Sequence, residues 1–128
     1  MPDETSSAQR ARLIAVVDDD YRVLEALGDL LQSSGYRTTL HASAESFLHS
    51  RERADVDLVV SDIGLPGISG LELLRALRGD ARSLPAILIT GRTDAHIADD
   101  ARALGVAVFA KPFDAVALLE TVSRALGC

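Results

Sequence analysis

The chain has 128 residues, which suits one compact domain with its own core and leaves too little sequence for two. Its formal net charge of −6 disfavours direct contact with nucleic acid phosphates. The single cysteine, Cys128, excludes an internal disulfide and a cysteine-based metal site. No apolar run of membrane-spanning length and no secretory leader is visible, so we expect a cytoplasmic protein without a membrane partner.

Short apolar runs alternate with amphipathic stretches along the chain. Residues 1–10 are polar and predict a flexible tail, so we expect one domain over 11–128. Five strands are predicted, at residues 13–17, 36–40, 57–61, 86–89 and 106–110, and the more polar second run indicates a sheet edge. Five helices are predicted between and after them, at residues 23–31, 44–48, 71–77, 94–104 and 115–126. This alternation predicts an α/β fold, a doubly wound parallel sheet in the order 2-1-3-4-5 with helices on both faces.

Polar residues follow four of the predicted strands. Asp18 and Asp19 follow the first strand, and Asp62 follows the third. Thr90 follows the fourth strand and Lys111 the fifth. In an open parallel sheet, ligands bind at the carboxyl ends of the strands where the strand order reverses, here between the first and third strands. We therefore expect these side chains to meet there.

Three carboxylates in one pocket need a cation or a raised pKa. Oxygen ligands favour Mg²⁺, and the carbonyl of Gly64 can face such an ion because glycine has no side chain. A carboxylate, a metal ion, a lysine and a hydroxyl together suit phosphoryl transfer. Gly91 leaves space beside Thr90. Taken singly, each of these residues is more often a cap or a turn residue; their common position at one sheet edge favours a site.

From about Leu13 to Leu126, the chain resembles the receiver domains of bacterial two-component response regulators. Four motifs carry the resemblance: Val16-Val17-Asp18-Asp19-Asp20, Ser61-Asp62-Ile63-Gly64-Leu65-Pro66-Gly67-Ile68-Ser69-Gly70, Ile89-Thr90-Gly91 and Lys111-Pro112-Phe113. The resemblance implies the flavodoxin-like version of the fold. It also implies a phospho-acceptor switch that takes part in its own phosphorylation and dephosphorylation, rather than an enzyme acting on a separate substrate.

The resemblance implies roles for individual residues. Asp62 would accept the phosphoryl group from a sensor histidine kinase or a phosphotransfer protein. Asp19, Asp62 and the Gly64 carbonyl would hold Mg²⁺, with Asp18 acting mainly through a metal-bound water. Thr90 and Lys111 would contact the phosphoryl oxygens.

The same resemblance implies a cis peptide bond between Lys111 and Pro112. Phosphorylation would shift the surface made by residues 94–104, the last strand and the last helix. That surface would act on an output domain or a downstream protein, and it is also the expected homodimer face. The sequence leaves open whether the chain is a complete regulator or a fragment of a longer one.

Val108 and Arg92 stand beside the expected site. The family usually carries an aromatic residue three positions before the lysine, where this chain has Val108, and Phe109 stands one step later. A one-residue slip in a strand turns a side chain to the other face, so we hypothesise a switch that uses no aromatic rotation. Arg92 and Gly64 would set how readily water reaches the phosphoryl group, although an exposed arginine is an equally good reading.

Three other functions fit the sequence less well. A haloacid-dehalogenase-type phosphatase would share the aspartates, but Arg22 stands where its signature needs Thr or Val. A nucleotide- or flavin-binding module needs a glycine-rich loop after the first strand, and this chain has three carboxylates there. A receiver that has lost phosphorylation is disfavoured because the full residue set is present.

Overall fold

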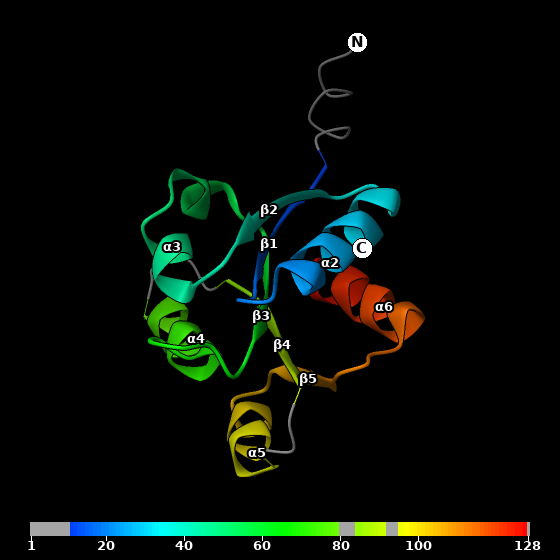
Figure 1. The fold of residues 1–128 in the computed structure, drawn as a ribbon. Helices are drawn as coiled ribbons and strands as arrows, with labels where there is room; N and C mark the ends of the chain where they lie inside the picture. The colour runs from blue at the N-terminus through cyan, green and yellow to red at the C-terminus, as the bar shows by residue number, and fades with distance from the viewer. Residues whose placement is uncertain (1–10, 80–83, 92–94, 128) are drawn as a thin grey trace.

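A computed structural model describes residues 11–79, 84–91 and 95–127. The expected tail, 1–10, lies outside the described residues. In chain order (Figure 1), the elements are β1 (Leu13–Val17), α2 (Tyr21–Ser33), β2 (Arg37–His41), α3 (Ala44–Leu48), the 3₁₀ turn η1 (Arg51–Asp55), β3 (Leu58–Asp62), α4 (Gly70–Arg78), β4 (Ala86–Thr90), α5 (Ala95–Ala103), β5 (Ala107–Ala110) and α6 (Ala115–Ala125).

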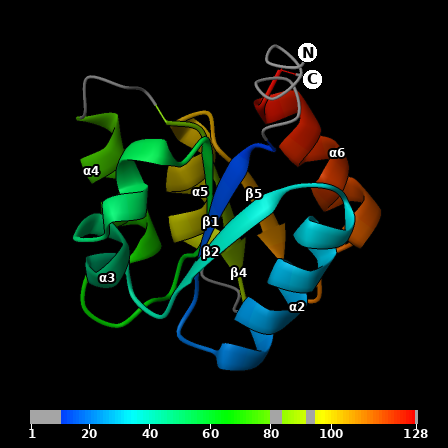
Figure 2. The same cartoon turned by 90° about the horizontal axis from the view of Figure 1, so that it is seen from above.

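The five strands form one parallel sheet in the order β2-β1-β3-β4-β5. Figures 1 and 2 show α2 and α6 on one face and α3, α4 and α5 on the other. The predicted doubly wound fold and strand order are therefore confirmed. Strand β2 is added on one side of β1, and β3, β4 and β5 are added on the other side, so the strand order reverses between β1 and β3. This is where the sequence predicted the site.

The apolar strands are buried because both faces of the sheet are covered. Every residue of β1 and β3 is buried. Since successive side chains point to opposite faces, Ile14 and Val16 pack with α2 and α6. Leu13, Ala15 and Val17 instead pack with Phe47 of α3 and the core beneath α4. Edge strand β2 keeps the polar pattern that the sequence predicted for it.

Three strands, β2, β3 and β5, begin one residue later than predicted. For β2 and β5 the reason is the same. The backbone N–H of Tyr36 donates to Leu31 O at 3.1 Å, and that of Val106 donates to Ala101 O at 3.3 Å. Each residue follows a glycine with positive φ that ends the preceding helix, Gly35 at +96° and Gly105 at +81°. These bonds are typical of the Schellman motif, which ties the residue after the glycine back to the helix.

Local capping explains the short and terminal helices. Ser43 accepts a hydrogen bond from the Ser46 backbone N–H at 3.0 Å and so starts α3. Asp114 caps α6 in the same way. The turn η1 was not predicted, because its polar sequence carries no helical pattern. Within the described residues, no helix combines the length and the apolar character that a membrane crossing requires.

Candidate functional site

Three carboxylates converge at the carboxyl ends of β1 and β3. Asp18 and Asp19 directly follow β1, and Asp62 is the last residue of β3, its neighbour in the sheet. One carboxylate oxygen from each residue lies within 4.8 Å of the others. Asp18 and Asp62 are buried, and Asp19 is exposed. The structure thus brings together the three aspartates that the sequence singled out.

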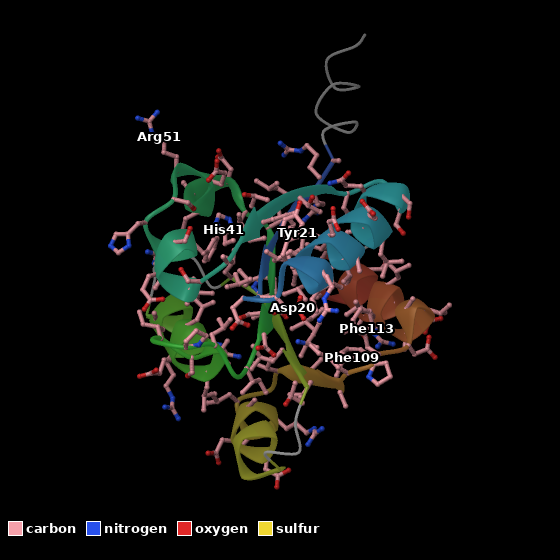
Figure 3. The ribbon with its side chains drawn as sticks, in the orientation of Figure 1. Asp20, Tyr21, His41, Arg51, Phe109 and Phe113 are labelled. Carbon is pink, nitrogen blue, oxygen red and sulfur yellow. The ribbon has the colours of Figure 1, made fainter. Side chains whose placement is uncertain are left out.

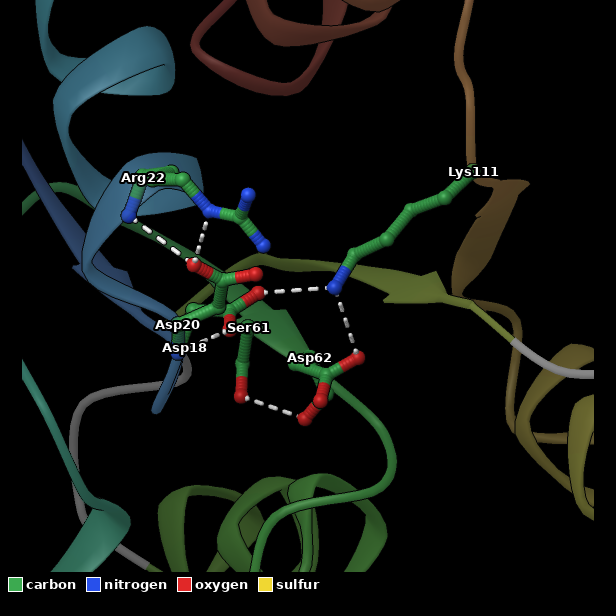
Figure 4. A network of polar contacts seen from close by, with 6 residues as sticks. All are labelled: Asp18, Asp20, Arg22, Ser61, Asp62 and Lys111. Carbon is green, nitrogen blue, oxygen red and sulfur yellow. Dashed lines mark hydrogen bonds and ion pairs between the residues drawn. The ribbon is translucent and has the colours of Figure 1, made fainter.

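Asp18 is fixed from three directions, and Figure 4 shows its contacts with Asp20 and Lys111. Its backbone N–H donates to His41 O at 3.1 Å, and its Oδ1 accepts from the Asp20 backbone N–H at 2.8 Å. Its Oδ2 accepts from Lys111 Nζ at 3.0 Å. With a side chain only 2% exposed, Asp18 is a buried anion whose charge is balanced by a specific cation.

Lys111 joins two of the carboxylates. Its ammonium lies 3.0 Å from Asp18 Oδ2 and 3.5 Å from Asp62 Oδ1, and its side chain is 25% exposed. Burial works to lower the pKa of Lys111, but the hydrogen bond from its ammonium to Asp18 and the charge of Asp62 outweigh burial and hold the pKa above its usual value. Lys111 is therefore the cationic partner that the sequence predicted for this site.

Asp62 shows the opposite balance. Burial raises its pKa, the charge of Lys111 opposes this, and the charges of Asp18 and Asp19 add to it. The net direction is upward although Lys111 is close, because burial and two neighbouring anions outweigh one cation. A second positive charge in the pocket would act to lower this pKa.

The donor set fits Mg²⁺. All three converging side chains offer carboxylate oxygens, which are the ligands preferred by a hard divalent cation. Neither histidine nor cysteine belongs to this cluster in the described part of the chain, which disfavours zinc. Asp18, Asp19 and Asp62 would hold the ion.

Strand pairing places Thr90 beside Lys111. The Lys111 backbone N–H donates to Thr90 O at 2.7 Å, and Thr90 pairs with Ala110 in the β4–β5 register. A Cβ on Gly91 would lie 3.3 Å from Lys111 Cδ, so the glycine makes room for the lysine stem. The Lys111–Pro112 peptide bond is cis, as the resemblance implied. Arg92 lies outside the described residues.

Gly64 lies in the loop that follows β3, two residues after Asp62. It is exposed, and a Cβ there would lie 3.9 Å from Asp62 Oδ2, which is ordinary contact. Glycine is therefore not required at this position by space alone. The role expected for its carbonyl stays a prediction.

Val108 and Phe109 point to opposite faces of the sheet. Val108 packs with the core beneath α4 and α5, whereas Phe109 packs with the core beneath α2 and α6. Phe113 packs against the same core, and both aromatic residues are labelled in Figure 3. Val108, three residues before Lys111, thus lies on the α5 face of the sheet. The ring of Phe109 lies on the opposite face, beneath α2 and α6.

Asp20 and Arg22 belong to helix α2 rather than to the carboxylate cluster. Asp20 Oδ1 accepts from the Arg22 backbone N–H at 2.9 Å, which makes Asp20 the helix cap. That hydrogen bond and the nearby Arg22 side chain lower the pKa of Asp20. Asp20 thus acts as the N-cap of α2.

Gly70 is a site residue that the sequence places only within the motif that follows Asp62. It is the first residue of α4, and a Cβ there would lie 2.3 Å from Asp62 O and 2.9 Å from Ile63 Cα. Only a glycine lets the helix start this close to the backbone of Asp62. The capping box of Ser69 and Glu72, readable in the sequence, marks the start of the helix and could have revealed the position.

Comparison with known proteins agrees with this geometry. The family model described as the response regulator receiver domain matches residues 14–123. The chain belongs to the response regulator receiver domain family. The structure of a CheY-like receiver domain protein from Methanospirillum hungatei has a TM-score of 0.82 at 28% identity, covering 91% of this chain and 94% of that one. A response regulator receiver protein from Pseudomonas putida has a TM-score of 0.79 at 35% identity, covering 89% and 97%.

Curated relatives of this receiver domain are longer proteins. The transcriptional regulatory protein FixJ of Azorhizobium caulinodans is 43% identical over 89% of this chain and 54% of its own length. The response regulator protein TodT of Pseudomonas putida is 36% identical over 93% of this chain and 53% of its own. The receiver domain described here thus spans about half the length of these relatives. The family resemblance seen in the sequence is confirmed.

Proposed function

We propose that this receiver domain accepts a phosphoryl group on Asp62 in a Mg²⁺-dependent reaction. The observation that carries the proposal is the placement of the Asp62 carboxylate, 3.5 Å from Lys111 Nζ and clustered with Asp18 and Asp19 at the reversal point of the sheet. The donor would be a phosphohistidine of a sensor histidine kinase or of a phosphotransfer protein. The domain would be a switch that takes part in its own phosphorylation and in the hydrolysis of the phosphoryl group from Asp62, not an enzyme with a separate substrate.

In the proposed reaction, an oxygen of Asp62 attacks phosphorus while the bond between phosphorus and the donor nitrogen breaks. Mg²⁺, when bound, supplies positive charge to the phosphoryl oxygens. Lys111 supplies a second positive charge, and to do so it gives up part of its contact with Asp18 or Asp62. Thr90, whose carbonyl accepts from the Lys111 backbone N–H, would donate its hydroxyl to the same oxygens.

The proposed output is a changed surface over α5, β5 and α6. Lys111 follows β5 directly, so a move of its ammonium toward a phosphoryl group pulls on the end of that strand. This surface would act on an output domain or a downstream protein and could also pair two copies of the domain. By analogy with FixJ, named a transcriptional regulator, the output would control transcription while the acidic receiver itself makes no direct contact with nucleic acid.

The aromatic residue of β5 would not rotate during this switch. Phe109 already packs in the core between the sheet and the α2–α6 layer. We expect the same Phe109 rotamer in structures with and without a beryllofluoride phosphoryl mimic. A large swing of its ring would contradict this.

Intact mass after incubation with acetyl phosphate tests the proposed acceptor. We expect one phosphoryl adduct that requires Mg²⁺ and is absent in Asp62→Ala. Asp55→Asn, an exposed aspartate of η1, is the matched control and should be phosphorylated like the wild type. No adduct on folded wild-type protein in the presence of Mg²⁺ would refute the proposal and favour a receiver that has lost phosphorylation.

A further inference from the structure

A glutamate from a different helix holds the loop that leaves the acceptor aspartate. The loop runs from residue 63 to residue 69, between β3 and α4. Glu45, in the first turn of α3, accepts a hydrogen bond through Oε2 from the backbone N–H of Ile68 at 3.3 Å. This contact joins positions that are 23 residues apart in the chain.

The loop is shaped to receive that carboxylate. Gly67 has φ +73°, in the left-handed region that favours glycine. A Cβ on Gly67 would lie 2.5 Å from Glu45 Oε2 and 3.4 Å from Glu45 Cδ. Gly67 therefore serves both the backbone turn and the close approach of Glu45, and the two residues fit each other.

The contact is not explained by a gain in folding stability. Oε1 of Glu45 is buried and has no hydrogen-bond partner among the described residues. A buried acceptor without a donor is costly, and here it is set against one long hydrogen bond. An apolar side chain would avoid this cost but would leave the loop without its anchor. Local rules of stability are most often broken at functional sites.

The position of this loop bears directly on the acceptor site. The loop starts at the end of β3, next to Asp62, and carries Gly64, whose carbonyl is expected to face the metal. Its far end is fixed where Gly70 packs against Asp62 O. Between these ends, the hydrogen bond from the Ile68 backbone N–H to Glu45 Oε2 joins the loop to α3.

We propose that Glu45 is a positioning residue of the Mg²⁺ site: by holding Gly67 and Ile68, it sets the path of the β3–α4 loop and with it the Gly64 carbonyl. The inference rests on the proposed function. The effect would come from the hydrogen bond to the Ile68 N–H and from the fit of the Glu45 side chain against Gly67, not from the negative charge of the carboxylate.

Mg²⁺ affinity, measured by calorimetric titration, tests this without any phosphorylation step. Loss of a residue that orients a metal ligand typically weakens metal binding by about 10–100-fold, and we expect the low end, about tenfold, for Glu45→Ala. Glu45→Gln keeps a carbonyl acceptor for the Ile68 N–H at nearly the same size, so its affinity should stay close to that of the wild type. Glu25→Ala, an exposed glutamate of α2, is the matched control and should not change Mg²⁺ affinity.

A second readout needs no metal. In Glu45→Ala, the amide resonances of Ile68 and Gly64 should shift in metal-free protein, because the hydrogen bond is lost and the loop moves. Unchanged Mg²⁺ affinity in Glu45→Ala, with only a lower unfolding temperature, would overturn the inference and leave Glu45 a structural residue. Equal weakening in Glu45→Ala and Glu45→Gln would also overturn it, since charge would then be the cause.

The two proposals fail in different ways. Wild-type protein that binds no Mg²⁺ would refute the proposed function, and the inference would fall with it. Wild-type protein that binds Mg²⁺ and is phosphorylated, with Glu45→Ala matching it in both respects, would refute the inference alone.

Discussion

Replacing Gly70 with alanine should disturb the acceptor site through the backbone. The added methyl group would lie 2.3 Å from Asp62 O, 2.9 Å from Ile63 Cα and 3.0 Å from Asp62 C. All three atoms belong to the backbone, so no side chain can rotate away to relieve the contact. Either α4 shifts outward or the end of β3 moves.

The size of the effect follows from two opposing contributions. Overpacking a tight site costs about 1–3 kcal/mol, and contacts this short favour the upper end. Alanine in a helix gains up to about 1 kcal/mol over glycine. A net loss of about 2 kcal/mol corresponds to a fall in Tm of roughly 6–10 °C for a domain of this size.

Thermal unfolding of Gly70→Ala and Gly79→Ala measures the effect with a built-in control. Gly79 ends the same helix at φ −80°, and its nearest contact to an added Cβ would be Ala76 O at 3.5 Å. Gly79→Ala should therefore change Tm by no more than a few degrees. We also expect slower phosphorylation of Gly70→Ala at equal Mg²⁺. If the two variants unfold at the same temperature, the close contact between Gly70 and Asp62 does not exist.

Three further predictions concern stability. Burial raises the pKa of Asp62, so the metal-free wild-type protein should lose folding stability as pH rises from the unfolded pKa through the folded pKa. The free energy of unfolding of Asp62→Asn, relative to that of the wild type, should therefore increase from pH 4 to pH 7. A difference that stays constant over this range would contradict the prediction. Burial lowers the pKa of His41, so the wild-type protein should lose folding stability as pH falls below about 6.5. Over the same pH range, His41→Asn should lose less of its free energy of unfolding, measured by urea unfolding. Ser69→Ala removes a capping box and should cost about 1 kcal/mol, while the exposed Ser33→Ala should cost under about 0.5 kcal/mol, both read from urea midpoints.

The fold was predictable because each level of the sequence points to the same answer. The run Leu13–Val17 is apolar throughout because β1 is covered on both faces, and the polar pattern of β2 reflects its position at the edge. The strand ends then bring Asp18, Asp62 and Lys111 together without further assumption. Strand starts were less predictable, since the backbone bond from Tyr36 to Leu31 leaves no mark in the hydrophobic pattern.

Contacts between elements far apart in the chain could not be predicted. Nothing in the sequence around Glu45 says that it reaches Ile68, and a glycine at position 70 reads as part of a turn until the helix start is located. The face occupied by Phe109 also depended on where β5 begins, because a shift of one residue reverses the side chains. Distances between backbones decide these features, and a pattern of residue types does not record distances.

Gly35 and Gly105, two of the positive-φ glycines, lie at the edge of the sheet opposite the site, and this edge is the more tolerant of change. Gly35 and Gly105 each end a helix at the amino ends of the strands, and nothing lies within 4 Å of a Cβ built on either. Loops at the opposite edge are held by Lys111, Glu45 and Gly70. Peptide insertions or reporter groups after Gly35 or Gly105 should therefore leave the chemistry of Asp62 intact, whereas one added residue in the β3–α4 loop should abolish it. The architecture allows its connections to lengthen at one edge while the other keeps its dimensions.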